Sequence, residues 1–432
     1  MRLALLFGAA VLSLVACGGA APPSPAGFHE STVGETYRFP AEFEPQEAVW
    51  MAWPTYENKA GHSSKDVVLA ISAALAGHVK VELLAQNEAE KPLIEAAFDA
   101  AHIPRAHVTL RAVAHADFWL RDNGPIFVEN RSGNAAMVDF VFNGWGFADF
   151  DPAMGKVEDE VDRQIAHLRG FPIVKSSVAS EGGDREFNGK GTLMATWAVE
   201  QQRNPGKSRQ EIEEEFGRVL GVRHFVWLPQ GIAEDEASYQ GPLPGGIYTP
   251  LTPGGHIDEY ARFADANTIL LGEVSEEGAK ADTIRKMTRE RLETARLVIE
   301  KSVDQDGKPF RIVRMPMPEP LYDTLGPGDG VYETLKSFHY PPGVTFPVGS
   351  PIRIIVSASY LNFLISNGVV VAQKYHKEGR PSRMKEKDES ALRILREVFP
   401  GREVIAVDAE AVNLGGGGIH CITQQEPKWN VK

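Results

Sequence analysis

Hydrophobic and polar positions along the chain predict helices that alternate with strands. Apolar residues at helical spacing, including Ile212, Phe216 and Leu220, indicate a helix over 208–220, and the run 224–228 follows it as a strand. Helices are also predicted over 67–76, 88–101, 157–168, 282–301 and 389–399, and strands over 80–85, 108–113, 172–174 and 404–407. This alternation is typical of an α/β fold.

Two further stretches of the chain are predicted as paired strands, and two others as long loops. The strand pairs are 118–128 with 136–142, and 256–263 with 268–274. The loops are 241–255 and 315–351, which are rich in proline and glycine. Long loops in a compact protein are often lids or binding loops, so both could border a site.

The N-terminus has the pattern of an export signal. Arg2 precedes an apolar stretch, 3–14, that is too short to cross a bilayer, and small residues then lead to Cys17. The pattern indicates a bacterial lipoprotein signal over 1–16, cleaved before Cys17 and acylated on it; the alternative is an ordinary secretory signal. Residues 17–35 are rich in proline, glycine and alanine and predict a flexible tether. We therefore expect a protein exported to the cell envelope, in the periplasm or at the outer membrane, and anchored by lipid.

Composition narrows the classes of partner. The formal charge is −13, and a chain that starts at Cys17 loses only Arg2, which gives 44 − 58 = −14. Such an acidic protein does not bind nucleic acid through a basic surface, and it attracts small cations. The 43% hydrophobic content is ample for a large core, and the length of 432 residues by itself favours two or three domains.

Cys421 is the candidate nucleophile. The chain has two cysteines, so lipidation of Cys17 would leave Cys421 as the only thiol. The alternative is a small buried apolar residue, which most free cysteines are. His420 is adjacent and would point away on an extended chain, which favours His256 as the partner of the thiol. His256 and Asp258 would face the same side of a strand, although a surface pair on an edge strand is also open.

Three other segments could contribute to a site. Trp119 lies between Asp117 and Asp122, and an aromatic face with two acids suits a cation; the alternative is a core tryptophan before a turn. Glu181 precedes two glycines at a bend, where a ligand could approach closely; the alternative is a plain turn. Glycines 415–418 permit unusual backbone conformations and could present carbonyl groups to a cationic substrate.

Taken together, six ordered segments resemble the agmatine deiminase and Porphyromonas-type peptidylarginine deiminase family of guanidine-modifying enzymes. The segments are 44–54, 119–125, 181–183, 255–258, 360–363 and 416–425, and the resemblance runs from about Phe43 to Gln425. It implies a five-bladed α/β propeller of the pentein type, with pseudo-fivefold symmetry and a central active site. It also implies one catalytic domain over 36–432, against the expectation from length.

The resemblance implies a role for each matched residue. Cys421 would be the nucleophile and His256 the general acid and base, while Asp122 and Asp258 would hold the guanidinium and Glu181 would be a further active-site acid. The residues that would line the site are Trp119, Asn362, Trp145, Gly417 and Gly418. The expected reaction proceeds through a thiouronium intermediate on the cysteine and needs no metal or organic cofactor.

The segment after Asn143 bears on the substrate. Peptidylarginine deiminases of this family place arginines there to hold the substrate's carboxylate, whereas this chain has Gly144, Trp145 and Gly146. The difference favours agmatine, with N-carbamoylputrescine as product and a link to putrescine biosynthesis. A peptidylarginine deiminase that makes citrulline and a non-catalytic guanidine-binding lipoprotein are the alternatives, and a homo-oligomer stays open.

Four features complicate the agmatine hypothesis. Glu259 stands where agmatine deiminases usually have asparagine, the loops 237–253 and 315–351 are long, and export is unusual for a polyamine enzyme. Carboxylates beside Cys421 would also disfavour its thiolate. Either the substrate's cation lowers the pKa of the thiol on binding, or a thiolate–imidazolium pair with His256 exists beforehand.

Overall fold

The structure, a computed structural model, describes residues 36–147 and 151–429. The predicted signal over 1–16, the lipidation site Cys17 and the tether 17–35 lie outside these residues. Within the described ranges, no helix has both the length and the apolar character needed to cross a membrane.

Five sheets share one pairing pattern: a first strand runs antiparallel to a second, and the second runs parallel to a third. The first sheet consists of β19 (Gln424–Pro427), β2 (Gln46–Ala52) and β3 (Lys80–Ala85), and the second of β5 (Ile126–Asn130), β6 (Ala135–Val141) and β7 (Ile173–Ala179). The third consists of β8 (Arg185–Phe187), β9 (Thr192–Thr196) and β10 (His224–Leu228), and the fourth of β11 (Ala261–Phe263), β12 (Thr268–Glu273) and β13 (Arg311–Pro316). The fifth consists of β16 (Leu364–Ser366), β17 (Val369–Gln373) and β18 (Glu403–Val407).

Two edge strands and one separate pair complete the sheets. Strand β4 (Val108–Ala112) extends the first sheet beside β3, and β1 (Tyr37–Arg38) extends the second beside β5. Strands β14 (Tyr322–Leu325) and β15 (Ile352–Ile355) form an antiparallel pair. The predicted α/β class is thus confirmed, whereas the arrangement of the five units as propeller blades about one axis stays a prediction.

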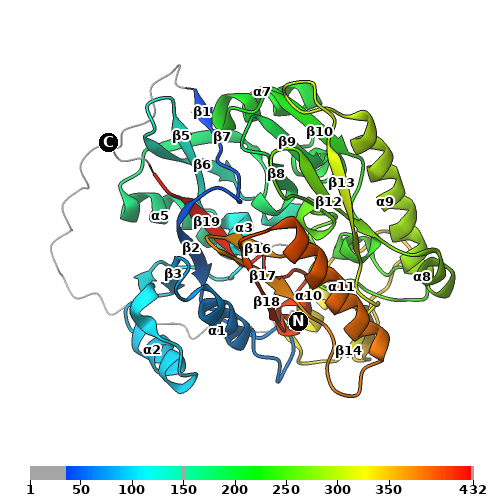
Figure 1. The fold of residues 1–432 in the computed structure, drawn as a ribbon. Helices are drawn as coiled ribbons and strands as arrows, with labels where there is room; N and C mark the ends of the chain where they lie inside the picture. Colours follow the sequence, from blue (N-terminus) through cyan, green and yellow to red (C-terminus); the bar gives the residue numbers. More distant parts are fainter. Residues whose placement is uncertain (1–35, 148–150, 430–432) are drawn as a thin grey trace.

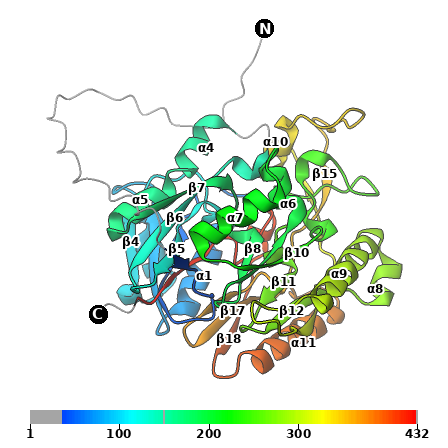
Figure 2. The same cartoon turned by 90° about the horizontal axis from the view of Figure 1, so that it is seen from above.

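The parallel step within each of the five sheets is bridged by helices, as a parallel connection requires. These helices are α1 (Ser64–Leu75); α4 (Pro152–Glu158) with α5 (Val161–Arg169); α6 (Trp197–Arg203) with α7 (Arg209–Leu220); α8 (Glu276–Ala281) with α9 (Thr283–Lys301); and α11 (Ser382–Val398). The remaining helices are α2 (Lys91–Ala100), α3 (Leu120–Asn123), α10 (Gly330–Ser337) and α12 (Glu410–Asn413). In Figure 1, helices α1, α5, α7, α9 and α11 lie around the periphery with the strands inside, and Figure 2 shows α4 and α10 together on one side.

The hydrophobic core explains why the amphipathic helices form where the periodicity predicts them. Helix α7 begins with a capping box between Ser208 and Glu211, and it buries Ile212, Phe216 and Leu220 against the second and third sheets. One large cluster of buried apolar side chains runs from Val49 on β2 to Ile422 before β19, so the first and last parts of the chain share a core.

Several predicted elements are wrong. Residues 118–128 do not form one strand, because helix α3 turns the chain at Gly124 before β5 begins; a Cβ at Gly124 would lie 2.1 Å from the carbonyl oxygen of Leu120. The predicted helix 157–168 spans parts of two helices, α4 and α5. The last long helix, α11, starts at Ser382 and not at 389, and the predicted loop 315–351 contains β14 and α10.

Candidate active site

Cys421 lines a cavity of about 550 Å³. It sits in the turn between α12 and β19, and its side chain is buried. The Nδ2 group of Asn362 donates a hydrogen bond to its Sγ atom at 3.0 Å, and the sulfur lies 3.6 Å from Oδ2 of Asp258. A Cβ at Gly417 would approach the sulfur to 2.8 Å, so only glycine fits over the thiol.

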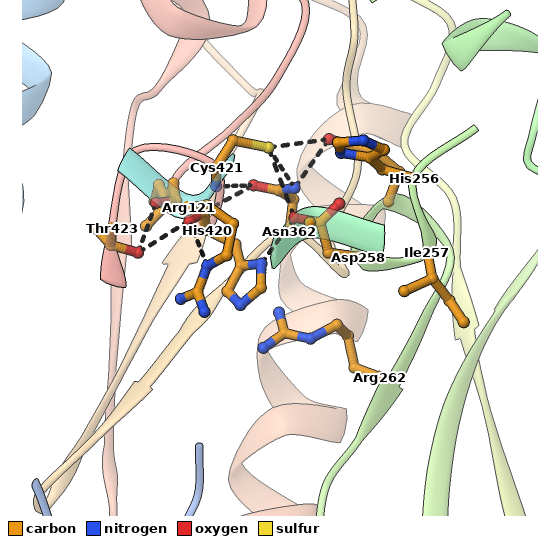
Figure 3. Close-up of polar contacts among 12 residues, drawn as sticks. Arg121, His256, Ile257, Asp258, Arg262, Asn362, His420, Cys421 and Thr423 are labelled. Atoms are coloured by element: carbon orange, nitrogen blue, oxygen red, sulfur yellow. Dashed lines mark hydrogen bonds and ion pairs between the residues drawn. The ribbon is translucent and has the colours of Figure 1, made fainter. Parts of the chain in front are cut away.

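His420 turns away from the thiol and holds Asp258 from behind. Its Nδ1 lies 2.7 Å from Oδ2 of Asp258, and its Nε2 lies 2.8 Å from Oε2 of Glu42. Arg262 in turn donates to the same Glu42 oxygen at 2.7 Å. Figure 3 shows Cys421 and His256 on one side of Asp258, with His420 and Arg262 on the other. The sequence argument against His420 as the partner of the thiol therefore agrees with the geometry.

His256 faces the cavity between two acids. Its Nε2 lies 3.2 Å from Oε2 of Glu181, and its Nδ1 lies 3.8 Å from Oδ1 of Asp122. Burial opposes the charged imidazolium, but the charges of Asp122 and Glu181 outweigh burial and raise the pKa of His256 to about 10. His256 therefore carries a proton at neutral pH. Burial also works against the charge of Glu181, but Arg203 and His256 lower the pKa of Glu181 to about 2.

The predicted strand through His256 is wrong, and its backbone explains why. His256 precedes a short 3₁₀ helix, η6 (Ile257–Glu259), and β11 begins only at Ala261. Its backbone N–H donates to Asp235 Oδ2, a side chain 21 residues earlier in the chain. His256 and Asp258 still border the same cavity, although not through the two-residue period of a strand.

Asp122 is fixed in place by two donors. The indole Nε1 of Trp145 donates to its Oδ2 at 2.8 Å, and the backbone N–H of Gly183 donates to its Oδ1 at 3.0 Å. Trp145 adopts a left-handed backbone conformation, with φ of 54°, in the short 3₁₀ turn η2 (Gly144–Gly146). The ring of Trp119 borders the cavity and stacks on Phe118 with 4.9 Å between centroids.

The cavity is acidic. Its lining includes seven carboxyl side chains and, among the described residues that line it, no lysine or arginine; the acids are Glu57, Asp117, Asp122, Asp151, Asp235, Asp258 and Glu259. Burial, followed by the charges of Asp258, Glu259 and Asp122, raises the pKa of the Cys421 thiol well above its ordinary value. The site therefore favours a neutral thiol when empty and suits a cationic ligand.

The residues named from sequence fall into two layers. Those that line the cavity are Cys421, His256, Asp122, Asp258, Trp119, Trp145 and Gly417. Glu181, Asn362 and Gly418 lie behind them: Glu181 supports His256, and Oδ1 of Asn362 accepts the N–H of His420 at 2.8 Å. Among glycines 415–418 only Gly416 has a positive φ, and the carbonyl of Gly417 already accepts a hydrogen bond from Asn413. The Gly417 carbonyl is therefore not free to bind a substrate, contrary to the expectation for this glycine segment.

Comparison with known proteins identifies the family. The model of the Porphyromonas-type peptidyl-arginine deiminase family matches residues 38–427. The chain belongs to this family. Two relatives are an agmatine deiminase of Pseudomonas aeruginosa, 30% identical over 90% of this chain and 95% of its own, and a putative agmatine deiminase of Streptomyces coelicolor, 31% identical over 91% and 99%.

Solved structures of similar proteins give the same result. The agmatine deiminase of Enterococcus faecalis has 25% sequence identity and a TM-score of 0.71, covering 93% of this chain and 100% of its own. A putative arginine deiminase of Porphyromonas gingivalis has 26% identity and a TM-score of 0.68, covering 91% and 98%. The predicted family is therefore confirmed from both sequence and fold.

In this deiminase-family protein, sequence reasoning missed several residues of the outer cavity. Helix α10 and the residue after it contribute Gly330, Thr334, Ser337 and Phe338, and the segment predicted as a loop before His256 contributes Leu251 and Pro253. The rings of Phe338 and Phe147 lie 5.4 Å apart at this rim. Residues of both long segments thus line the cavity, which the sequence left open. Helical periodicity in 330–338 is the signal that could have placed α10.

Two groups of side chains within the described residues have the spacing of metal ligands. The first group is Glu42, Glu186 and His420, and the second is Asp258, Glu259 and Cys421. Within each group the ligand atoms lie within 4.8 Å of one another. Arg262 already pairs with Glu42 and with Glu186, at 2.7 and 2.5 Å, which satisfies the charge of the first group. The second group surrounds the thiol, where its acids are equally suited to an organic cation.

Replacement of Trp145 by phenylalanine is expected to weaken substrate binding. The variant keeps the aromatic surface but removes the N–H that donates to Asp122, a hydrogen bond to a charged group that is worth ~1.5 kcal/mol or a roughly tenfold higher KM. Steady-state kinetics with the substrate proposed below would measure it. Trp227→Phe is the matched control, because it loses an indole hydrogen bond to Glu213 outside the cavity. An unchanged KM in Trp145→Phe would show that the hydrogen bond does not position Asp122.

Proposed function

We propose that this protein hydrolyses the guanidinium group of agmatine to N-carbamoylputrescine and ammonia. The observation that carries the proposal is a buried thiol that lines an acidic cavity together with His256 and two aspartates. Paired carboxylates hold a planar guanidinium by parallel hydrogen bonds, and the thiol supplies the nucleophile. The named agmatine deiminases among the relatives, which match almost the whole chain, support the same reaction.

The geometry suggests a role for each group in the reaction. Asp122 and Asp258 hold the guanidinium and localise its charge, which makes the central carbon a better electrophile. The bound cation lowers the pKa of the Cys421 thiol, which gives its proton to solvent. The thiolate then attacks that carbon, and the C–S bond forms as a tetrahedral adduct. His256, which holds a proton at neutral pH, gives it to the departing nitrogen, and ammonia leaves.

Hydrolysis of the covalent intermediate completes the cycle. His256, now neutral, takes a proton from a water molecule that attacks the thiouronium carbon. The C–S bond then breaks, and the remaining proton of the attacking water passes to the Cys421 thiolate as the ureido carbonyl forms. The ureido product leaves, and a neutral thiol with a protonated His256 restores the resting site. Glu181 remains behind His256 throughout and keeps the ring in place through its contact with Nε2.

The charge of the cavity favours agmatine over arginine. A substrate with a carboxylate would bring a negative charge into a lining that has seven acids and, among the described residues, no lysine or arginine. The protonated His256 of this lining is already paired with Asp122 and Glu181. Agmatine has an amino group and no carboxylate, so both of its ends suit the acidic lining. The product would serve a route to putrescine.

We also propose that the chain is exported and anchored by lipid at Cys17. The support is the sequence alone, in which a short apolar segment with Arg2 before it ends at Cys17. Metabolic labelling with a radioactive fatty acid would test the anchor. Label in the wild type and none in Cys17→Ser is the expected result; equal label in both would contradict it.

Ammonia release tests the proposed activity. The protein from Phe28 onward would be assayed with agmatine, free arginine, and peptides with internal or C-terminal arginine, with Cys421→Ala as control. We expect turnover of agmatine that the control lacks. Turnover of the arginine peptides alone would show that the outer rim, and not the charge of the cavity, determines specificity. If the protein binds guanidines but releases ammonia from none of them, it is a guanidine-binding protein and not an enzyme.

A further inference from the structure

Asp235 is a buried acid of the cavity with no role so far. It ends the 3₁₀ turn η4 (Ala233–Asp235) and is 1% exposed. Its Oδ2 accepts the backbone N–H groups of Gly255 at 2.9 Å and of His256 at 2.7 Å. One oxygen of Asp235 therefore holds the segment that carries His256, while the residue as a whole also lines the cavity.

The other oxygen of Asp235 has no partner among the described residues. Oδ1 of Asp235 is buried without a hydrogen bond, and so is Oδ1 of Asp258. Both oxygens of Asp122 differ from these, because Trp145 and Gly183 already donate to them. In the ionised form of Asp235, this oxygen is a buried acceptor without a donor, which costs free energy, and a ligand rich in N–H groups removes that cost. Among the described side chains that line the cavity, the buried oxygens without a hydrogen-bond partner thus belong to Asp235 and Asp258.

The charged groups around Asp235 make a bound cation favourable there. Its charge interacts with those of His256, Asp258 and Glu259 and acts on the hydroxyl of Tyr260. Burial and the charge of Asp258 together raise the pKa of Asp235 to about 8, although His256 and the two backbone N–H groups act in the opposite direction. A cation between Asp235 and Asp258 would lower that pKa again and release a proton at neutral pH.

We infer that Asp235 is a substrate-binding residue, whose Oδ1 accepts a hydrogen bond from the guanidinium beside Oδ1 of Asp258. The inference rests on the proposed guanidine-hydrolase function. A guanidinium has N–H donors on all three nitrogens, which is more than Asp122 and Asp258 can pair with in a bidentate manner. Asp235 reaches the cavity from a different turn, η4, and so meets a different edge of the same plane. The carboxylate of Asp235 would then hold both the backbone of His256, through Oδ2, and the substrate, through Oδ1.

Asp235→Asn tests the inference with little change in shape. The amide oxygen can still accept from Gly255 and His256, while an N–H donor replaces the unpaired acceptor Oδ1. We expect KM for agmatine to rise on the order of 30-fold, with a smaller change in kcat, because a charge-assisted hydrogen bond is lost. The matched control is Asp184→Asn: Asp184 is buried and accepts the N–H of Ile257 at 3.1 Å, but it does not line the cavity.

Proton release on binding separates a binding role from a structural one. In Cys421→Ala, where the thiol cannot contribute, agmatine binding would be followed by calorimetry at neutral pH in two buffers of different ionisation enthalpy. We expect Cys421→Ala to release up to about one proton more than Cys421→Ala with Asp235→Asn. Equal proton release, or equal KM changes in Asp235→Asn and Asp184→Asn, would overturn the inference. If the wild type releases no ammonia, the proposed function fails, whereas the calorimetry still decides whether Asp235 binds the cation.

Discussion

Replacement of Cys421 by alanine is expected to lower ammonia release from agmatine to below about 10⁻⁴ of the wild-type rate, because no other group can form the covalent intermediate. Within the described part of the chain, Cys421 is the free cysteine, and its sulfur faces Asp258 at 3.6 Å. Agmatine should still bind, since the acids of the cavity are unchanged. Ammonia assays and calorimetry on one preparation would measure both effects, and near-ultraviolet circular dichroism would control for folding.

The ionisation of the same thiol gives a second readout. Because burial and the nearby acids raise the pKa of Cys421, the empty protein should show little thiolate absorbance at neutral pH. A cationic inhibitor beside Asp258 and Asp122 should lower that pKa and increase the absorbance, as substrate-assisted ionisation requires. Cys421→Ala supplies the baseline. If the apparent pKa does not move on binding, substrate-assisted ionisation is wrong.

Replacement of His256 by glutamine is expected to reduce kcat by about 10²- to 10⁴-fold, the usual contribution of a general acid and base. Glutamine keeps a polar side chain that can hydrogen-bond to Glu181 but cannot deliver a proton to the leaving nitrogen. The affinity for agmatine should change much less than kcat, because Asp122 and Asp258 remain. Single-turnover kinetics would distinguish the two. A loss confined to KM would assign His256 to binding and not to proton transfer.

The pH profile tests the protonated state of His256. The pKa of this group is raised from 6.5 to about 10 in the folded protein, so its proton, and the stability it adds, are fully present below pH 6.5 and lost as the pH rises through about 10. The wild-type kcat should therefore fall on the alkaline side near pH 10. This decrease should be absent from the residual activity of His256→Gln, and its persistence there would assign it to another group.

Much of the fold could be predicted from local pattern, and the exceptions have physical causes. Helices α7 and α9 present a regular apolar face to the core, so their periodicity is clear in the sequence. The segment before Asp258 does not follow a local pattern, because Asp235 holds the N–H of His256 from 21 residues away. Such a long-range hydrogen bond overrides the strand that the apolar residues around it indicate.

The site shows the same division between what residue types reveal and what only folding reveals. The thiol and its acid partners could be named from sequence because their chemistry is distinctive and their segments resemble the family. The contact of His420 with Glu42 joins residues 378 positions apart, and no spacing rule predicts it. Asp235 was missed for a related reason: its unpaired oxygen exists only because two distant turns, η4 and η6, meet at one cavity.

Capture of the covalent intermediate tests the central claim most directly. The protein would be mixed with agmatine, quenched in acid within the first turnover, digested and analysed by mass spectrometry. The account predicts that the peptide containing Cys421 carries the substrate minus ammonia, that the adduct disappears as turnover ends, and that Cys421→Ala has none. Ammonia released in full over that turnover, with an unmodified Cys421 peptide at every quench time, would contradict a cysteine nucleophile.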